Sequence, residues 1–156
     1  MNTTHVQMLL AEDSASDADL ILASLAKVSL AEATRVVHDG VETLDFVFCR
    51  GDYVDRQNEP PLRVIVLDVK LPNLDGFEVL REIKAHSRTR LIPIVLLTSS
   101  NIDADIARGY LLGANSYVQK PVDFEEFRET IRRLGLYWMT INEPPPPKQL
   151  SERTRS

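Results

Sequence analysis

Short runs of branched apolar residues recur along the chain, and a stretch with helical character separates each run from the next. Two runs, 64–67 and 94–97, are apolar at four consecutive positions. Strands covered by helices on both faces show this continuous pattern, whereas half-exposed strands alternate apolar and polar residues. The alternation of runs and helical stretches predicts a parallel sheet, with strands at residues 6–11, 33–37, 64–69, 92–98 and 116–119.

Four of the intervening stretches begin with residues typical of helix starts. In each, a Ser or Asp is followed three positions later by an acid, so that the first side chain can cap the helix and the acid can interact with the helix dipole. The pairs are Ser14/Asp17, Asp75/Glu78, Ser100/Asp103 and Asp123/Glu126. Five helices are predicted, the first at 15–27 and the last at 124–138. On the last helix we expect one face to pack in the core, and it carries Phe124, Phe127, Ile131 and Leu134.

These elements predict one doubly wound α/β domain, a five-stranded parallel sheet with five helices on its two faces. The 156 residues suffice for a single hydrophobic core, and we assign residues 1–141 to it. Four prolines at 144–147, followed by polar residues, predict a Pro-rich disordered tail at 142–156. The polar segment 50–61 is longer than the ~2–6 residues usual for such a connection, so we expect a surface loop there.

Composition narrows the class of protein further. Hydrophobic residues make up 44% of the chain and charged residues 26%, the balance of a soluble globular protein. Apolar runs are far shorter than the ~18 residues of a membrane helix, and the first residues do not resemble a secretory signal. We therefore expect a cytoplasmic protein without a membrane partner. The net charge of −5 disfavours nucleic acid as a partner. The single cysteine, Cys49, lies in an apolar run and is expected to be buried.

Polar side chains follow the predicted strands at their carboxyl ends. Glu12 and Asp13 follow the first strand, Asp68 the third, Thr98 ends the fourth and Lys120 follows the fifth. The carboxyl ends of parallel strands meet at one edge of the sheet, where such folds place their sites. Three carboxylates at one edge repel one another unless a cation is present. Oxygen ligands of this kind suit Mg²⁺.

This set resembles the response-regulator receiver family over residues 6–138, and the chain also has the pairs Leu71-Pro72, Asp75-Gly76, Thr98-Ser99 and Lys120-Pro121 in the expected order. The resemblance implies a flavodoxin-like fold with strand order 2-1-3-4-5. It implies that Asp68 is the phosphorylated nucleophile. Mg²⁺ would bind Asp13, Asp68 and the main-chain carbonyl of Lys70 directly, and Glu12 through water.

The resemblance also assigns roles to three further residues. Thr98 and Lys120 would contact phosphoryl oxygens, Tyr117 would change rotamer together with Thr98, and the Lys120-Pro121 peptide bond would be cis. Physical chemistry agrees with these roles, because phosphoryl transfer depends mainly on positioning and on stabilising negative charge. Such a protein catalyses only its own phosphorylation and dephosphorylation, so we do not expect a turnover enzyme.

Within the family, the chain is most similar to the small stand-alone response regulators of bacterial phytochromes. The similarity rests on the long segment with Gly51-Asp52-Tyr53, the strand Ile92-Pro93-Ile94-Val95 and the aromatic end of the last helix. It implies a sensor histidine kinase, of the bacteriophytochrome type, as partner. The apolar surplus at 136–139 further predicts a homodimer, formed through the fourth helix, the fifth strand and the last helix. The alternatives are that these residues pack against the domain's own loops, or that a monomer uses this surface to bind the kinase.

The residues disfavour three other functions. A haloacid dehalogenase-like phosphatase places a second acid two positions after its nucleophile, but Lys70 stands there. A nucleotide- or flavin-binding protein of the same architecture needs glycines after its first strand, but residues 12–16 contain none. A degenerate receiver that acts as a scaffold without phosphate is disfavoured, because every expected group is present. The residues therefore favour a phosphorylated signalling module.

Overall fold

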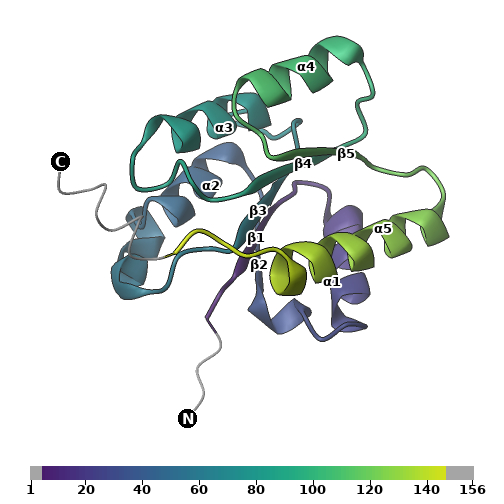
Figure 1. Ribbon diagram of the computed structural model, residues 1–156, viewed down its shortest axis with the longest axis horizontal. Helices are drawn as coiled ribbons and strands as arrows, with labels where there is room; N and C mark the ends of the chain where they lie inside the picture. The colour runs from purple at the N-terminus through teal and green to yellow at the C-terminus, as the bar shows by residue number, and fades with distance from the viewer. Residues whose placement is uncertain (1–4, 147–156) are drawn as a thin grey trace.

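Five parallel strands form the central sheet in the order β2-β1-β3-β4-β5, as predicted. The computed structural model describes residues 5–146 (Figure 1). The strands are β1 (Met8–Ala11), β2 (Thr34–Val37), β3 (Val64–Leu67), β4 (Ile94–Thr98) and β5 (Ser116–Gln119). Four of them are shorter than predicted. For β4 the reason is chemical, since Pro93 has no amide hydrogen for the ladder and contributes only its carbonyl, which accepts from Ile65 N at 2.9 Å.

Helices cover both faces of this sheet, giving three layers (Figure 1). One face is covered by α1 (Ala15–Ala26) and α5 (Phe124–Leu136), and the other by α2 (Gly40–Val47), α3 (Gly76–Ala85) and α4 (Asp103–Leu111). Successive residues of β1 and β3 point into the two resulting cores in alternation. All eight positions of these two strands are buried, which explains why their sequences are continuously apolar.

Three of the four predicted helix caps are confirmed. The side chains of Ser14, Asp75 and Asp123 each accept a hydrogen bond from the backbone three residues on. The cap predicted at Ser100 is wrong, because α4 begins at Asp103 and its N-cap residue Ile102 makes no side-chain bond. The Ser100 hydroxyl donates instead to Asp105 Oδ2 at 2.6 Å. A further cap, Asp39 at the start of α2, was not predicted.

The last helix changes geometry at its end. Phe127, Ile131 and Leu134 are buried as predicted, but Phe124 is 64% exposed, so that part of the prediction is wrong. Phe124 is the first residue of α5 and lies beyond the edge of the core. After Leu136 the chain forms a π-helical turn, η3 (Tyr137–Ile141), in which Met139 is buried and Tyr137 exposed. Because the π-helical turn is wider, these side chains point in other directions than they would in a continued α-helix.

The connection from α2 to β3 is an ordered element and not the loop that the sequence predicted. It forms a short 3₁₀ segment, η2 (Gly51–Asn58), with a kink at Tyr53. Tyr53 Oη donates to Glu42 at 2.7 Å, and the Arg56 guanidinium lies 3.6 Å from the centre of the Phe46 ring. Cys49, just before η2, has a positive φ of 55° and is half-buried, so the expectation of full burial is wrong.

Among residues 5–146 there is no helix with the length and apolar character needed to cross a bilayer. Of the predicted tail at 142–156, residues 147–156 lie outside the described part of the chain. Its first part contacts the domain, since Arg63 donates to the Asn142 carbonyl at 2.8 Å.

We expect Arg56 to contribute to the stability of the domain, because it stacks on Phe46 and also donates to the Phe46 carbonyl. Arg56→Ala should lower the free energy of unfolding by about 1–3 kcal/mol, the cost of a lost cation–π contact and an unsatisfied carbonyl. Urea unfolding measures this. Arg88→Ala is the control, since Arg88 is exposed and has no ion pair in the described part of the chain. Equal loss in both variants would contradict the assignment.

Candidate functional site

The sheet's hydrogen bonds continue one residue beyond the strands at the carboxyl edge and fix the residues of the site. Glu12 N donates to the Val37 carbonyl at 3.0 Å, and Asp68 N donates to the Ala11 carbonyl at 3.1 Å. Lys120 N donates to the Thr98 carbonyl at 2.8 Å. The backbone therefore brings together four side chains that are separated by up to 108 residues in the sequence.

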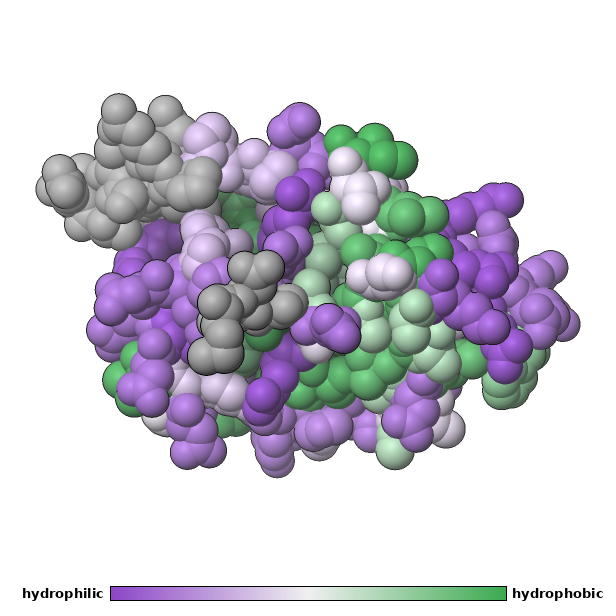
Figure 2. All heavy atoms as spheres, turned by 90° about the horizontal axis from the view of Figure 1, so that it is seen from below, coloured by the Kyte–Doolittle hydropathy of each residue, from purple (hydrophilic) through white to green (hydrophobic). Residues whose placement is uncertain are grey.

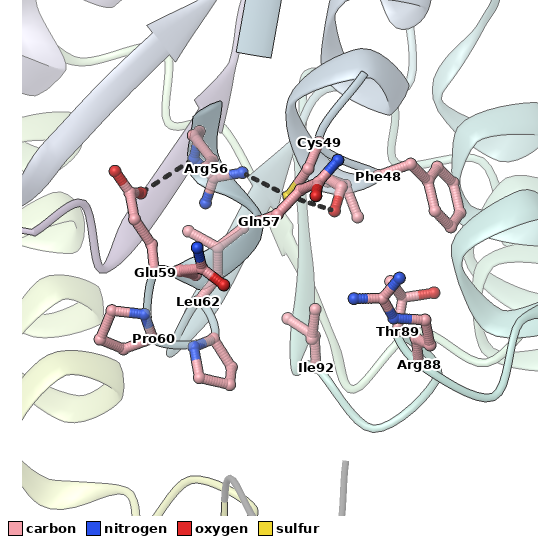
Figure 3. A pocket seen from close by; sticks show the side chains of 13 residues that line it. Phe48, Cys49, Arg56, Gln57, Glu59, Pro60, Leu62, Arg88, Thr89 and Ile92 are labelled. Carbon is pink, nitrogen blue, oxygen red and sulfur yellow. Dashed lines mark hydrogen bonds and ion pairs between the residues drawn. The ribbon is translucent and has the colours of Figure 1, made fainter. Parts of the chain in front are cut away.

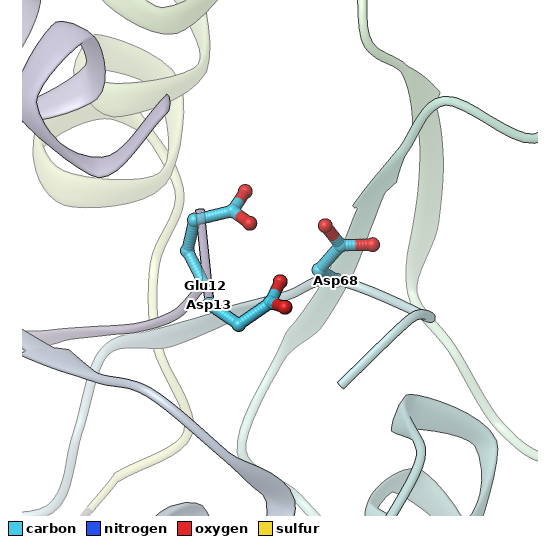
Figure 4. A group of neighbouring side chains, drawn as sticks. All are labelled: Glu12, Asp13 and Asp68. Carbon is cyan, nitrogen blue, oxygen red and sulfur yellow. The ribbon is translucent and has the colours of Figure 1, made fainter. Parts of the chain in front are cut away.

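Three carboxylates form an acidic cluster at this edge. Oxygen atoms of Glu12, Asp13 and Asp68 all lie within 4.8 Å of one another, and Figure 4 shows the three side chains turned toward a common point. Glu12 and Asp68 are buried, whereas Asp13 is exposed. Hard oxygen ligands on one open side fit Mg²⁺, which keeps several waters and prefers one or two carboxylates. The residues predicted as metal ligands are thus together, and Lys70 lies beside them on the exposed side.

Asp68 is held from two sides. Its Oδ1 accepts a hydrogen bond from Lys70 N at 3.1 Å, and its Oδ2 lies 2.8 Å from Lys120 Nζ. Its carbonyl oxygen lies against the first turn of α3, since a Cβ placed on Gly76 would come within 2.2 Å of it. Only glycine allows this approach, which explains the Asp75-Gly76 pair noted in the sequence.

Lys120 is the positive charge of the site. Its Nζ contacts Glu12 Oε1 at 2.5 Å, Asp68 Oδ2 at 2.8 Å and Asp17 Oδ2 at 3.0 Å. Burial alone lowers the pKa of Lys120, but its hydrogen bonds to Asp68 and Glu12 outweigh that effect and hold the pKa above its ordinary value. Lys120 is therefore charged at neutral pH.

Glu12 is the most buried acid of the cluster. Its pKa is raised to about 7, chiefly by burial and also by the nearby charge of Asp68, against the opposing effect of the hydrogen bond from Lys120. Ser14 N also donates to Glu12, at 3.2 Å. Burial is the chief cause and the charge of Asp68 a lesser one, so the ionised form of Glu12 is disfavoured in this position even with Lys120 beside it.

Thr98 ends β4, and Tyr117 lies on the neighbouring strand β5. The Thr98 hydroxyl is fully buried and has no hydrogen-bond partner within residues 5–146. A buried hydroxyl without a partner costs free energy, so its presence at the strand end suits a ligand oxygen. Tyr117 donates to the Ser100 carbonyl at 3.0 Å. Its ring lies against α4, since a Cβ placed on Gly109 would be 3.3 Å from a ring carbon of Tyr117.

One predicted detail of the site is wrong. The Lys120-Pro121 peptide bond was expected to be cis, but no cis bond occurs within residues 5–146. The trans form is favoured by about 0.5–1 kcal/mol for a bond before proline, and with it Lys120 still reaches Asp68.

Asp17 belongs to the site although the sequence analysis gave it only a role at the start of α1. Its carboxylate pairs with Lys120, 103 residues away in the sequence. The two residues meet because α1 and α5 pack side by side on one face of the sheet. No local pattern in the sequence signals this contact.

Two hollows on the surface differ in their relation to the site. One of about 380 Å³ lies beside Lys120 and Asp17 and has apolar walls that include Leu20, Phe124 and Phe127. A larger one, of about 550 Å³, lies at the opposite edge of the sheet between η2 and the residues that precede β4 (Figure 3). Because the larger hollow is remote from the acidic cluster, it does not mark the reactive site.

We expect Mg²⁺ to stabilise the folded protein by binding the acidic cluster. Several millimolar Mg²⁺ should raise the melting temperature, by about 2–4 °C for each kcal/mol of binding free energy, and Asp13→Asn should reduce that rise. Asp103→Asn is the control, since Asp103 is an exposed acid on α4, away from the cluster. Thermal melts with and without Mg²⁺ test this. An unchanged wild-type melting temperature would mean that the cluster is not a magnesium site.

Comparison with known proteins agrees with this geometry. Residues 8–132 match the family model of the response regulator receiver domain. A probable methanogenesis regulatory protein, FilR2 from Methanothrix harundinacea, is 36% identical over 140 residues, which cover 90% of this chain and 88% of that protein.

Two solved structures are also similar. The phosphorylated cyanobacterial phytochrome response regulator RcpA matches with a TM-score of 0.83 and 30% identity, covering 91% of this chain and 99% of that one. The bacteriophytochrome response regulator RtBRR matches with a TM-score of 0.69 and 41% identity, covering 93% and 88%. Sequence, topology and the arrangement of acids at the sheet edge agree: the chain belongs to the response-regulator receiver family, and its similarity extends to response regulators of phytochromes.

Proposed function

We propose that this protein accepts a phosphoryl group on Asp68 from a sensor histidine kinase, in a Mg²⁺-dependent reaction, and that phosphorylation changes the surface it offers to partners. The observation that carries the proposal is the environment of Asp68. This buried carboxylate lies between Lys120 and two further acids, next to a buried threonine hydroxyl that has no partner in the described residues.

The chemical step uses the Asp68 carboxylate as nucleophile. One of its oxygens forms a bond to the phosphorus of a phosphohistidine, and the bond between phosphorus and the donor's imidazole nitrogen breaks. The imidazole leaves with the electron pair of that bond and takes up a proton. Lys120 and the Thr98 hydroxyl stabilise the negative charge on the phosphoryl oxygens.

A bound Mg²⁺ supplies positive charge that offsets both the acids and the incoming phosphoryl group. Asp13 and Asp68 would hold it with the Lys70 carbonyl, and Glu12 would hold it through water. The crowding of these acids around one lysine supports this role, because the folded chain gains from a second positive charge there.

The protein is a signalling module and not a turnover enzyme. Lys70 stands two positions after Asp68, where a phosphatase of related chemistry would carry its general acid and base. The reaction is therefore limited to phosphorylation of Asp68 and slow hydrolysis of the acyl phosphate. We propose that the protein acts in the cytoplasm, where kinases of this class present their phosphorylated histidine.

A phytochrome-type kinase is our proposed phosphodonor. The support is the similarity over most of the chain to response regulators described as belonging to a cyanobacterial phytochrome and to a bacteriophytochrome.

The proposed switch links Asp68 to α4 through Thr98 and Tyr117. When Thr98 turns toward a phosphoryl oxygen, it vacates space beside β5 into which the Tyr117 ring can move. Tyr117 would then give up its hydrogen bond to the Ser100 carbonyl. Since Ser100 also bonds Asp105 on α4, the movement alters how the start of α4 is held.

The surface affected by this switch is apolar enough to bind a second copy of the chain. Exposed apolar residues occur on α4, on the β5–α5 connection and at the end of α5, among them Leu111, Val122, Leu136, Tyr137 and Ile141. Figure 2 shows apolar side chains gathered on the underside of the molecule, the side of α1 and α5, whereas α4 lies on the opposite side (Figure 1). The α5 arginines pair with glutamates of their own helix, so the dimer contact would rest on apolar burial.

We expect one phosphoryl group to be added to each chain when a small phosphodonor and Mg²⁺ are present. Intact-mass measurement should find a single increment in wild type and none in Asp68→Asn, because the amide cannot form an acyl phosphate. Asp75→Asn is the control, since Asp75 caps α3 beyond the cluster. Labelling of Asp68→Asn to the wild-type extent would refute the assignment of the nucleophile.

We expect a homodimer whose dissociation constant changes on phosphorylation. Light scattering at tens of micromolar should give twice the 17.6 kDa mass of one chain, and Tyr137→Ala should weaken the dimer because Tyr137 is exposed at the end of α5. Val54→Ala, an exposed residue on η2, is the control.

In Thr98→Ala, phosphorylation should no longer change the dimer affinity, because the link to Tyr117 is lost. A wild-type mass of one chain, with or without phosphate, would exclude the dimer. An unaltered response in Thr98→Ala would exclude the switch.

A further inference from the structure

We infer that Asp17 is a positioning residue for phosphoryl transfer, whose carboxylate holds Lys120 and competes with the phosphoryl group for it. This inference rests on the proposed function, since it concerns the rate at which Asp68 is phosphorylated. It adds to the site a residue on α1 that lies outside the acidic cluster of Glu12, Asp13 and Asp68.

Lys120 has no spare hydrogen-bond donor for a phosphoryl group. An ammonium group has three hydrogens, and Lys120 Nζ already contacts three carboxylates, those of Glu12, Asp68 and Asp17. Each of these contacts is 3.0 Å or shorter. A phosphoryl oxygen can therefore pair with Lys120 only when one of the three acids gives up its hydrogen bond.

Burial decides which of the three acids releases Lys120. The side chains of Glu12 and Asp68 are 2% and 9% exposed, whereas that of Asp17 is 35% exposed. A buried carboxylate that loses its partner stays unpaired, but an exposed carboxylate is solvated by water when it is released. Asp17 is thus the acid that can release Lys120 at the lowest cost in free energy.

The negative charge of Asp17 lies close to the nucleophile Asp68. Asp17 Oδ2 and Asp68 Oδ2 both contact Lys120 Nζ, so these two oxygens lie within about 6 Å of each other. At this separation a negative charge on Asp17 repels an incoming phosphodonor, and solvent screens this repulsion only partly. Asp17 therefore opposes phosphorylation in two ways, by occupying Lys120 and by adding negative charge.

Its position at the surface makes Asp17 accessible to a partner. Asp17 lines the hollow of about 380 Å³ beside Lys120, together with Ser16, Ser99 and Phe124. A docked kinase that drew Asp17 away would free Lys120 at the moment of transfer, whereas a small phosphodonor cannot do so. This difference makes small phosphodonors the right probe for the intrinsic effect.

The experiment measures the second-order rate constant of phosphorylation by acetyl phosphate, in Mg²⁺, for wild type and Asp17→Asn. The variant keeps an acceptor near Lys120 but removes the charge, so the rate constant should rise about 3- to 10-fold. Asp19→Asn is the matched control, since Asp19 is exposed on the same helix and has no ion pair in the described part of the chain. Asp17→Glu should restore a rate near that of wild type.

Two further readouts separate this role from a structural one. The gain should shrink at high salt, because the charge repulsion is screened. It should also be smaller for phosphoramidate, which carries less net negative charge than acetyl phosphate at neutral pH. A change in helix stability would alter neither dependence, and melting temperatures of the variants show whether α1 is intact.

Each outcome decides between the two proposals. If wild type accepts no phosphoryl group, the proposed function fails. If wild type is phosphorylated and Asp17→Asn reacts at the same rate or more slowly, the inference about Asp17 fails while the proposed function stands. A gain that Asp19→Asn shows equally would reduce the effect to net charge and would also overturn the inference.

Discussion

The site depends on one ammonium group that neutralises several carboxylates in a largely buried position. Side-chain exposure is 9% for Lys120 and lower still for Glu12. Separating such charges from water is costly, and an acid left without its partner would be more costly still. The strand ends of β1, β3 and β5 and the first turn of α1 are therefore tied to one another through Lys120. This arrangement is electrostatically incomplete without further positive charge, which is the physical basis of the proposed cation and phosphoryl sites.

Close backbone approaches hold the acids in place around this lysine. A Cβ on Gly76 would meet the Asp68 carbonyl, and one on Gly40 would lie only 1.9 Å from the carbonyl of Leu74. The first residues of α2 and α3 thus pack directly against the segment between β3 and α3. The Asn73 amide also donates to Asp39 at 3.1 Å across the same gap. Because packing leaves this segment little freedom, Asp68 and the Lys70 amide are pre-positioned without help from a ligand.

The sequence predicted those features that depend on patterns within a few residues of one another. Continuous apolar strands, the caps at Ser14, Asp75 and Asp123, and the polar residues at strand ends all follow from local chemistry. The contact between Asp17 and Lys120 was missed because it joins distant elements. The order in η2 was missed because a polar segment carries little pattern of its own and is held by Tyr53 and Arg56 contacting α2. Family resemblance supplied the roles proposed for the site residues, and its implication of a cis Lys120-Pro121 bond is wrong.

The helix α4 differs from the others in how little it buries. Gly109 is its one buried residue, and its first turn lacks a side-chain cap. Few buried contacts imply a small free energy of local opening, so α4 belongs to the least protected part of the fold. Where two arrangements differ by only about 1–2 kcal/mol, one gained or lost hydrogen bond changes their populations several-fold. Because α4 is sparsely packed, the proposed switch would need only a small change in free energy to reposition this helix.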